Sequence, residues 1–375
     1  MPKIRIREID KTTNQELVSN DNVIFLVDTE YKDNDVKLIK KESDIPVNSK
    51  NTAFIKKVME LGGKVLVAKS YSAAKDYLKD RNQFDVKFLL AKQGESSTTD
   101  AGTISDFSQA IEIAKYRRDC AVVYTKILST DGTLKYEDDE LNLLKLVEAD
   151  SSTDSADDYE DEKNIPGKYV LPFYANDLKV DKNDCDAGKG YILAYLNSIK
   201  TNPEWLAIAG SKRGLIPDAS SIGFMTENDI DKMQPDGKKE SDIAINPIVD
   251  MNPWGVRIWG NRTAYVSQED NEGLVASSFA NIRILLCDLK KRLYKAARKY
   301  QFEQNSDILW VNFQAEVNTL LEEMVHSYGI AGYRWFREKT NDRAKIAARL
   351  QIVPIQAVED FDLTIELTDS LTVNE

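Results

Sequence analysis

The hydrophobic positions between residues 22 and 200 switch repeatedly between the two-residue period of strands and the 3.6-residue period of helices. Short apolar runs predict strands at 22–27, 65–68, 84–91, 120–128 and 169–175. Amphipathic runs predict helices at 51–61, 72–79, 104–117 and 190–200. Strands that alternate with helices favour a partly parallel sheet with helices packed on it.

The middle of the chain is less regular. Residues 205–209 are apolar and predict a short strand. Residues 210–237 are rich in Ser, Asp, Pro and Gly and predict a long loop, a feature that is usually functional or an interaction surface. We place a domain boundary just after this loop, at residues 249/250.

Two long amphipathic runs follow the boundary and predict helices at 274–299 and 306–326. Gly329 and Gly332 interrupt the second pattern and predict a turn, and residues 352–355 predict the end of a strand. The first helix carries a basic set in its C-terminal half, namely Lys290, Lys291, Arg292, Lys295, Arg298 and Lys299. These six residues form either a solvated face or a contact with an acidic partner.

Both ends of the chain have the two-residue period of strands with charge on one face. The N-terminal pattern is Lys3, Ile4, Arg5, Ile6 and Arg7, and the C-terminal pattern is Asp362, Leu363, Thr364, Ile365, Glu366 and Leu367. Residues 359–375 contain six acids and no base. A terminal strand has no sheet of its own to complete, so we expect each one to be donated to a neighbouring copy.

The net charge of −12 belongs mainly to one segment. Residues 137–162 contain twelve acids and one lysine, so the remainder of the chain is close to neutral. A near-neutral remainder argues against nucleic-acid binding. The acidic segment is expected to be an exposed loop, in which Leu141, Leu143, Leu144 and Leu146 could form one short helix. The sequence has no run long enough for a membrane span and no apolar start of the signal-peptide type, so we expect neither membrane insertion nor general secretion.

The sequence nominates no catalytic residue, cofactor site or metal site. Cys120, Cys185 and Cys287 lack metal-ligand spacing, and Cys120 is expected in the core. The single histidine, His326, is expected to be a partly buried structural residue. Gly188-Lys189-Gly190 does not meet the pattern of a phosphate-binding loop.

Residues 252–264 read Asn-Pro-Trp-Gly-Val-Arg-Ile-Trp-Gly-Asn-Arg-Thr-Ala, and in order with other segments they resemble the contractile-tail sheath proteins of phages and phage-derived injection machines. The helix, Gly-Gly turn and strand at 53–67 and the glycine-rich turn at 329–332 also fit that family. The inner-domain signature residues of this resemblance are Trp259, Gly260, Arg262, Thr263, Phe302, Glu303, Asn305 and Trp310. Within it, Trp259 is expected in the inner core, and Arg262 is expected to bond a carboxylate or carbonyls.

The resemblance implies an α+β or α/β protein with an inner mixed α/β oligomerisation domain, exchanged terminal strands and an outer α/β domain. The implied parts are an N-terminal arm at 1–20, the outer domain at 21–249, the inner domain at 250–350 and a C-terminal arm at 351–375. The acidic loop at 137–162 and residues 210–250 depart from the family pattern.

The function implied by the resemblance is mechanical. Such subunits polymerise helically around a tail tube and contract to drive the tube through a target cell envelope, without enzymatic activity or a cofactor. The implied partners are other copies of the chain and the tail tube, baseplate and tail terminator proteins. The implied location is a virion tail assembled in the host cytoplasm, and the basic set at 290–299 is a candidate contact with the tube or a neighbour.

Two other classes of function stay open on the sequence. The alternating strands and helices also suit a doubly wound ligand-binding protein or enzyme with its site at the carboxyl ends of the strands. A tube or baseplate protein of the same kind of machine is the other alternative.

Overall fold

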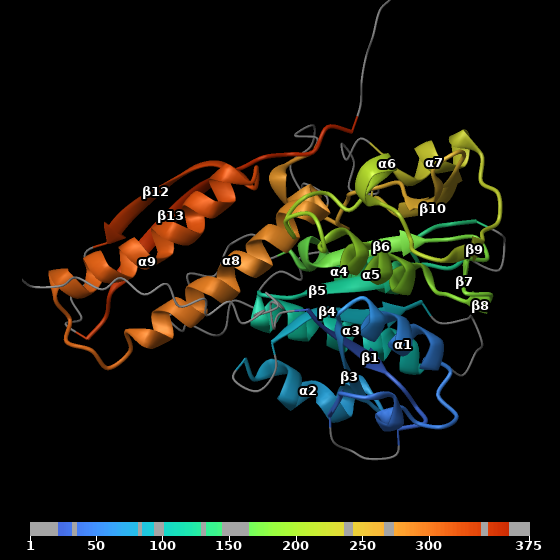
Figure 1. Ribbon diagram of the computed structural model, residues 1–375, viewed down its shortest axis with the longest axis horizontal. Coiled ribbons are helices and arrows are strands. Elements are labelled where there is room, and N and C mark those ends of the chain that lie inside the picture. Colours follow the sequence, from blue (N-terminus) through green and yellow to red (C-terminus); the bar gives the residue numbers. More distant parts are fainter. Residues whose placement is uncertain are drawn as a thin grey trace, which may run out of the picture.

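The computed structural model describes residues 22–31, 36–81, 85–93, 101–128, 133–144, 165–235, 243–265, 274–338 and 344–359. Their largest feature is an eight-stranded sheet with the strand order β11-β10-β6-β5-β4-β1-β3-β2 (Figure 1). The strands are β1 Val23–Val27, β2 Lys37–Ile39, β3 Lys64–Ala68, β4 Val86–Lys92, β5 Ala121–Thr125, β6 Val170–Tyr174, β10 Asn246–Met251 and β11 Gly255–Ile258.

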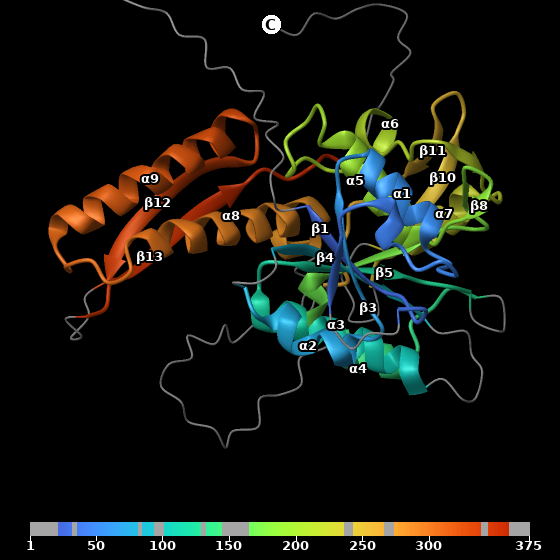
Figure 2. The same cartoon turned by 60° about the horizontal axis from the view of Figure 1, so that its bottom comes forward.

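The six central strands are parallel, and the edge strands β2 and β11 are antiparallel to their neighbours. The central strands are nearly continuous apolar runs because helices cover both faces of the sheet. Helices α1 Thr52–Glu60 and α5 Ala187–Ser198 lie on one face; α2 Tyr71–Lys79, α3 Ala101–Arg117 and α4 Asp138–Leu144 lie on the other (Figure 2).

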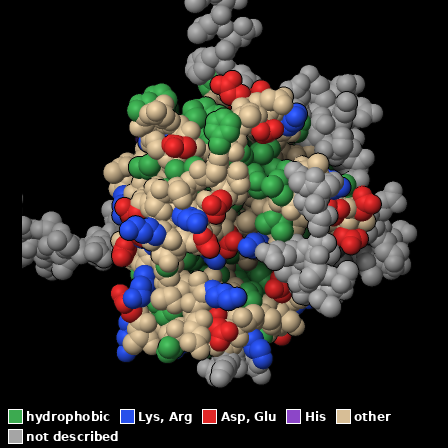
Figure 3. All heavy atoms as spheres, turned by 90° about the vertical axis from the view of Figure 1, so that its right-hand side faces the viewer, with side chains coloured by type: hydrophobic (Ala, Val, Ile, Leu, Met, Phe, Trp, Pro, Cys, Tyr) green, Lys and Arg blue, Asp and Glu red, His purple; other side chains and the backbone are tan. Residues whose placement is uncertain are grey.

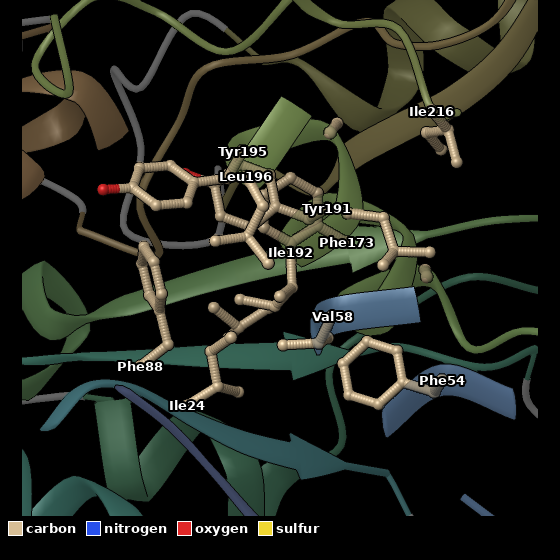
Figure 4. Packing of buried hydrophobic residues seen from close by; sticks show 14 of the residues in the cluster. Ile24, Phe54, Val58, Phe88, Phe173, Tyr191, Ile192, Tyr195, Leu196 and Ile216 are labelled. Carbon is tan, nitrogen blue, oxygen red and sulfur yellow. The ribbon is translucent and has the colours of Figure 1, made fainter. Parts of the chain in front are cut away.

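Alternate residues of each strand enter the two cores. Ile24 and Phe88 point to the α1 and α5 side, whereas Phe25 and Leu89 pack with α2 and α3. Figure 4 shows the first of these cores, in which the ring of Phe173 stacks on that of Tyr191 at 4.2 Å between centroids. We call this layered part of the molecule the body.

A second unit extends from the body (Figure 1). It consists of the helices α8 Ala280–Lys299 and α9 Asp307–His326 and the two-stranded antiparallel sheet of β12 Ile330–Glu338 and β13 Ala347–Pro354. Its core joins Leu285 and Leu289 of α8 to Val317 and Leu321 of α9. We call this part the helix–hairpin unit.

The remaining described elements are short and lie mostly around the carboxyl ends of the sheet strands. They are the strands β7 Lys179–Val180, β8 Asn183–Asp184 and β9 Ala219–Ser221, the helices α6 Gly210–Arg213 and α7 Glu227–Met233, and the 3-10 turns Glu42–Asp44, Pro166–Tyr169 and Ala276–Ser278. None of the described helices combines the length and apolar content needed to cross a membrane.

The mixed α/β fold class expected from the sequence is confirmed, and so are the body helices and strands predicted between residues 22 and 200. Three local predictions were wrong. Residues 205–209 form no strand, because Trp205 is buried among α8 and α9 and its indole N–H donates to the carbonyl of Ser327 at 3.2 Å. The predicted loop at 210–237 contains α6, β9 and α7, and the predicted turn at 329–332 is the start of β12.

The boundary placed at 249/250 falls inside β10, and the β10–β11 hairpin stays in the large sheet. The division into an outer and an inner domain therefore remains a prediction. The two terminal arm patterns, at 3–9 and 361–367, and most of the acidic loop lie outside the described residues.

Candidate assembly surfaces

Asn246 organises the loop that carries the first half of the signature. Its side-chain amide donates to the carbonyls of Pro172 and Arg262 at 2.8 and 2.7 Å, and its oxygen accepts from the Arg262 backbone N–H at 2.7 Å. Asn246 is fully buried, so these bonds satisfy polar groups that water does not reach. Sequence reasoning missed Asn246, because an asparagine at the start of an apolar strand carries no distinctive pattern.

The close packing around Asn246 leaves no room for a side chain at Gly260. A Cβ built on Gly260 would lie 2.6 Å from Oδ1 and 3.0 Å from Cα of Asn246, so a larger residue would displace the amide. Thr263 continues the attachment, since its hydroxyl donates to the carbonyl of Ser277 at 2.8 Å and its N–H to that of Ser278 at 2.9 Å. The loop therefore joins the edge of the large sheet to the start of α8.

Arg262 bonds a carboxylate, the kind of partner expected for it. Its Nε donates to Oε2 of Glu359 at 2.6 Å, and its guanidinium lies 5.4 Å from the ring centroid of Phe279. Glu359 comes five residues after the end of β13, so the bond ties the segment leaving the hairpin to the body. Nη1 of Arg262 and Oε1 of Glu359 are buried without a hydrogen-bond partner.

Trp259 does not lie in an inner core, contrary to expectation. Its side chain is 38% exposed, and its backbone N–H donates to the carbonyl of Pro247 at 2.8 Å. The reason is the position of β11 at the edge of the sheet, where Gly260 rather than Trp259 faces Asn246.

The second half of the signature lies at the far end of the helix–hairpin unit. Trp310 is buried, and its ring packs at a right angle to that of Trp335, 5.7 Å away. Phe302 is fully exposed at a positive φ of 69°, and Glu303 and Asn305 are exposed in the bend between α8 and α9. The eight signature residues therefore lie in two separate parts of the fold.

Much of the basic set on α8 is already paired within the molecule. Lys291 is buried and lies 2.9 Å from the carboxylate of Asp85, which also pairs with Lys295 at 2.7 Å. Arg292 pairs with Asp288 at 2.9 Å and Lys299 with Glu316. Lys291 is buried and therefore lies on neither a solvated face nor a contact surface. The other five members of the set remain partly or fully exposed, namely Lys290, Arg292, Lys295, Arg298 and Lys299.

The β12–β13 hairpin has two different faces. Tyr333, Trp335, Leu350 and Ile352 point toward α8 and α9 and pack on the core there. The opposite face carries exposed charged and polar side chains together with Phe336 and the exposed Val353. Each strand is paired on one side only within the described chain, so each has a free edge.

A groove of about 2080 Å³ runs beside β13. One wall is formed by α8 and the α8–α9 bend, another by the ends of α2 and α3, and a third by residues 344–350. Its apolar lining includes Leu293, Tyr294, Ala297, Tyr300, Trp310, Phe313, Trp335 and Leu350. The free edge of β13 therefore adjoins an apolar surface.

A second cavity of about 740 Å³ lies at the carboxyl ends of β4, β5 and β6, where a doubly wound enzyme would have its site. Three of its lysines already have carboxylate partners. Lys92 and Lys189 each pair with Asp186, at 2.8 and 2.7 Å, and Lys126 pairs with Glu140 at 2.7 Å. Burial lowers the pKa of Lys126, although Glu140 opposes that shift.

The cysteine and histidine considered in the sequence analysis occupy no candidate site. Cys120 is buried as expected, and burial raises the pKa of its thiol to about 12. His326 ends α9 and is exposed, which corrects the expectation of partial burial. Within the described ranges, no three His, Cys, Asp or Glu side chains are placed to share a metal ion. On the side of the body that carries β7, β8 and β9, acidic and basic side chains are interspersed among apolar ones (Figure 3).

Comparison with known proteins adds to this geometry. No protein-family model matches the chain. A curated relative, the tail sheath protein of Vibrio phage KVP40, is 25% identical over 187 residues. That match covers 48% of this chain and 26% of the relative, so the chain aligns with about a quarter of that protein's length.

Solved structures match over nearly the whole chain. The sheath complex of an extracellular contractile injection system, in the contracted state, has a TM-score of 0.66 at 15% identity, covering 98% of both chains. The fold is that of a contractile-tail sheath subunit. A baseplate structure of the anti-feeding prophage also matches, with a TM-score of 0.64 at 14% identity over 98% of this chain and 99% of that one. The sheath tail protein from Desulfitobacterium hafniense has a TM-score of 0.53 at 8% identity over 95% of this chain and 100% of that one.

These matches confirm the family resemblance read from the sequence and the α/β fold class that it implied. They include both halves of the molecule, since the body and the helix–hairpin unit together fall within the 98% that is covered.

Proposed function

We propose that this chain is the structural subunit of a contractile tail sheath, which polymerises around a tail tube and contracts to drive the tube through a target cell envelope. The observation that carries the proposal is the whole-chain fold match with a sheath complex in its contracted state, at a TM-score of 0.66. The curated relative named tail sheath protein supports the same function from the sequence.

The hairpin supports a specific way of linking the subunits. The free edges of β12 and β13 expose unpaired backbone N–H and C=O groups, which are a template for an added strand. The terminal segments 3–9 and 361–367 have strand periodicity and one apolar face each. Strands donated by neighbouring copies would extend the hairpin sheet, with the main-chain ladder supplying most of the affinity.

The attachment of the helix–hairpin unit to the body supports movement of each subunit as one piece. Lys291 and Lys295 of α8 both pair with Asp85 just before β4, and Thr263 bonds the 3-10 turn Ala276–Ser278 that precedes α8. The arms, rather than the body, are therefore the proposed links between subunits, and they persist while the subunits rotate during contraction.

The proposed partners are other copies of the chain, the tail tube, the baseplate and the tail terminator, in a tail assembled in the host cytoplasm. The outer α/β body would face away from the tube. The partly or fully exposed residues of the basic set remain the candidates for contact with the tube or a neighbour, namely Lys290, Arg292, Lys295, Arg298 and Lys299. The role is structural, without a catalytic step, a nucleotide or a bound cofactor.

Removal of either arm tests the linkage. Chains lacking residues 1–8 or 361–375 should stay folded and soluble but fail to form long tubes, whereas the full chain should form hollow cylinders in negative-stain electron microscopy. Circular dichroism and size-exclusion chromatography of the same samples check the fold. Tubes of normal length from either truncated chain would show that the arms are not the lattice links.

A further inference from the structure

The segment that leaves the β12–β13 hairpin is attached a second time, to the body. Ile355 still belongs to the hairpin, because its backbone N–H donates to the carbonyl of Gly329 at 3.1 Å. Four residues later, the carboxylate of Glu359 accepts from Nε of Arg262 at 2.6 Å. Figure 1 shows this segment, in red, running from the hairpin toward the body. Residues 355–359 are therefore held at both ends.

Arg262 is a firm point of attachment because the body holds it by several contacts. Its backbone N–H donates to Oδ1 of Asn246, and its carbonyl accepts from the Asn246 amide, both at 2.7 Å. It forms a β-bridge with Phe279, just before α8. Its side chain is only 6% exposed, and hydrogen bonds between ionised groups are strong where water has little access. The ion pair with Glu359 therefore fixes this part of the chain against β10 and the start of α8.

The attachment lies immediately before the strand pattern at 361–367. Only Asp360 separates Glu359 from Phe361. An extended chain spans at most about 3.6 Å per residue, so the strand begins within about 7 Å of the Glu359 backbone. Without the ion pair, the nearest attachment would be Ile355, and the same limit would be about 22 Å.

We propose that the Arg262–Glu359 ion pair is a positioning device, which fixes where the C-terminal strand leaves its own subunit and hence where a neighbouring subunit can accept it. The inference rests on the proposed function, in which that strand links subunits. A short tether keeps the strand at a high effective concentration beside the subunit that receives it. Arg262 and Glu359 act through the strand and need not touch the neighbour themselves.

The size of the effect follows from the length of the free tether. Each doubling of a flexible tether lowers the effective concentration by about 3-fold. Glu359→Ala would lengthen the free tether from one residue, Asp360, to the five residues 356–360. The critical concentration for tube assembly should therefore rise on the order of 10-fold.

Two insertions of the same sequence into the full-length chain test the proposal with the ion pair intact. A Gly-Ser-Gly-Ser-Gly insert between Gln356 and Ala357 lies before the attachment and should leave assembly unchanged. The same insert between Asp360 and Phe361 lies after the attachment and lengthens the free tether. It should raise the critical concentration on the order of 10-fold. Each insertion is the matched control of the other, because chain length and composition are identical.

The two insertions should become equivalent once the ion pair is removed. In the Glu359→Ala background both lie in one free tether of five residues, which each insert doubles. Each should therefore raise the critical concentration by about a further 3-fold. Sedimentation and electron microscopy measure the assembled fraction, and thermal melting checks that each variant is folded.

The outcomes separate this inference from the proposed function. Equal effects of the two insertions in the chain that retains Glu359 would overturn the positioning role. A folded Glu359→Ala variant that assembles at the wild-type concentration would overturn it as well. If Glu359→Ala fails to fold, the two insertions decide alone, because they keep the ion pair. Absence of tubes from the wild-type chain would contradict the proposed function, and this inference would fall with it.

Discussion

Arg262 shows how much of one residue's environment can be predicted and how much cannot. Its place beside glycine and tryptophan in a turn predicted a bonded guanidinium, and the structure provides the carboxylate. The identity of that carboxylate could not be predicted, because Glu359 lies 97 residues away along the chain. Trp259 shows the opposite error: a large apolar side chain predicts burial, but an edge strand leaves it partly exposed.

Replacement of Arg262 by lysine should destabilise the chain. Lysine can offer one ammonium but not the planar fork that bonds Glu359 and stacks on Phe279. Arg262→Lys is expected to lower the free energy of unfolding by about 1–3 kcal/mol. Urea unfolding measures this, with Arg298→Lys on the exposed surface as the matched control. An unchanged midpoint for Arg262→Lys would refute the anchoring role.

The cysteines should react slowly in the native chain. Burial raises the pKa of the Cys120 thiol to about 12 and that of Cys185 to about 12, and it also raises the pKa of Cys287. A raised pKa means less thiolate at a given pH, and the thiolate is the nucleophile. At pH 8, a thiol-reactive dye should label the native chain far more slowly than the unfolded chain. Immediate labelling of three thiols per native chain would contradict the described burial.

At the scale of elements, the body was predictable because its central strands are buried on both faces. Such strands appear in the sequence as short continuous apolar runs separated by amphipathic helices. Strand β12 was missed for the converse reason. It contains Gly332 and mixes aromatic with basic residues, because one face packs on α9 and the other is exposed.

The acidic segment gives a prediction at the same scale. Residues 151–162 are outside the described part of the chain, and their sequence carries many acids and few apolar side chains. Burial of such charges would be costly, so this segment should lie on the outer surface of the assembly. Deletion of 151–162 should leave tube formation unchanged, as should a Gly/Ser replacement of equal length. A folded deletion variant that cannot assemble would place the segment at a subunit contact instead.

At the scale of the whole molecule, the body and the helix–hairpin unit are joined by long-range charge pairs. Lys291 of α8 and Asp85 of the body are separated by 206 residues in sequence, and Lys295 of α8 pairs with the same carboxylate. Periodicity predicts faces and elements but not which distant charges meet, so the basic half of α8 could be interpreted only as solvated or as a partner contact. Several of these cations pair with carboxylates of the same molecule, and Lys291 is buried. Only the cations that remain partly or fully exposed are therefore candidates for a contact with a partner.

The central claim is that copies of this chain polymerise into a hollow sheath through exchanged terminal strands. A cryo-electron microscopy reconstruction of the purified full-length chain tests it most directly. The account predicts a helical cylinder in which the β12–β13 sheet of each subunit is extended by strands from neighbouring copies, with the α/β body on the outside. A chain that stays monomeric at high concentration, or a polymer whose hairpin edges remain unpaired, would contradict it.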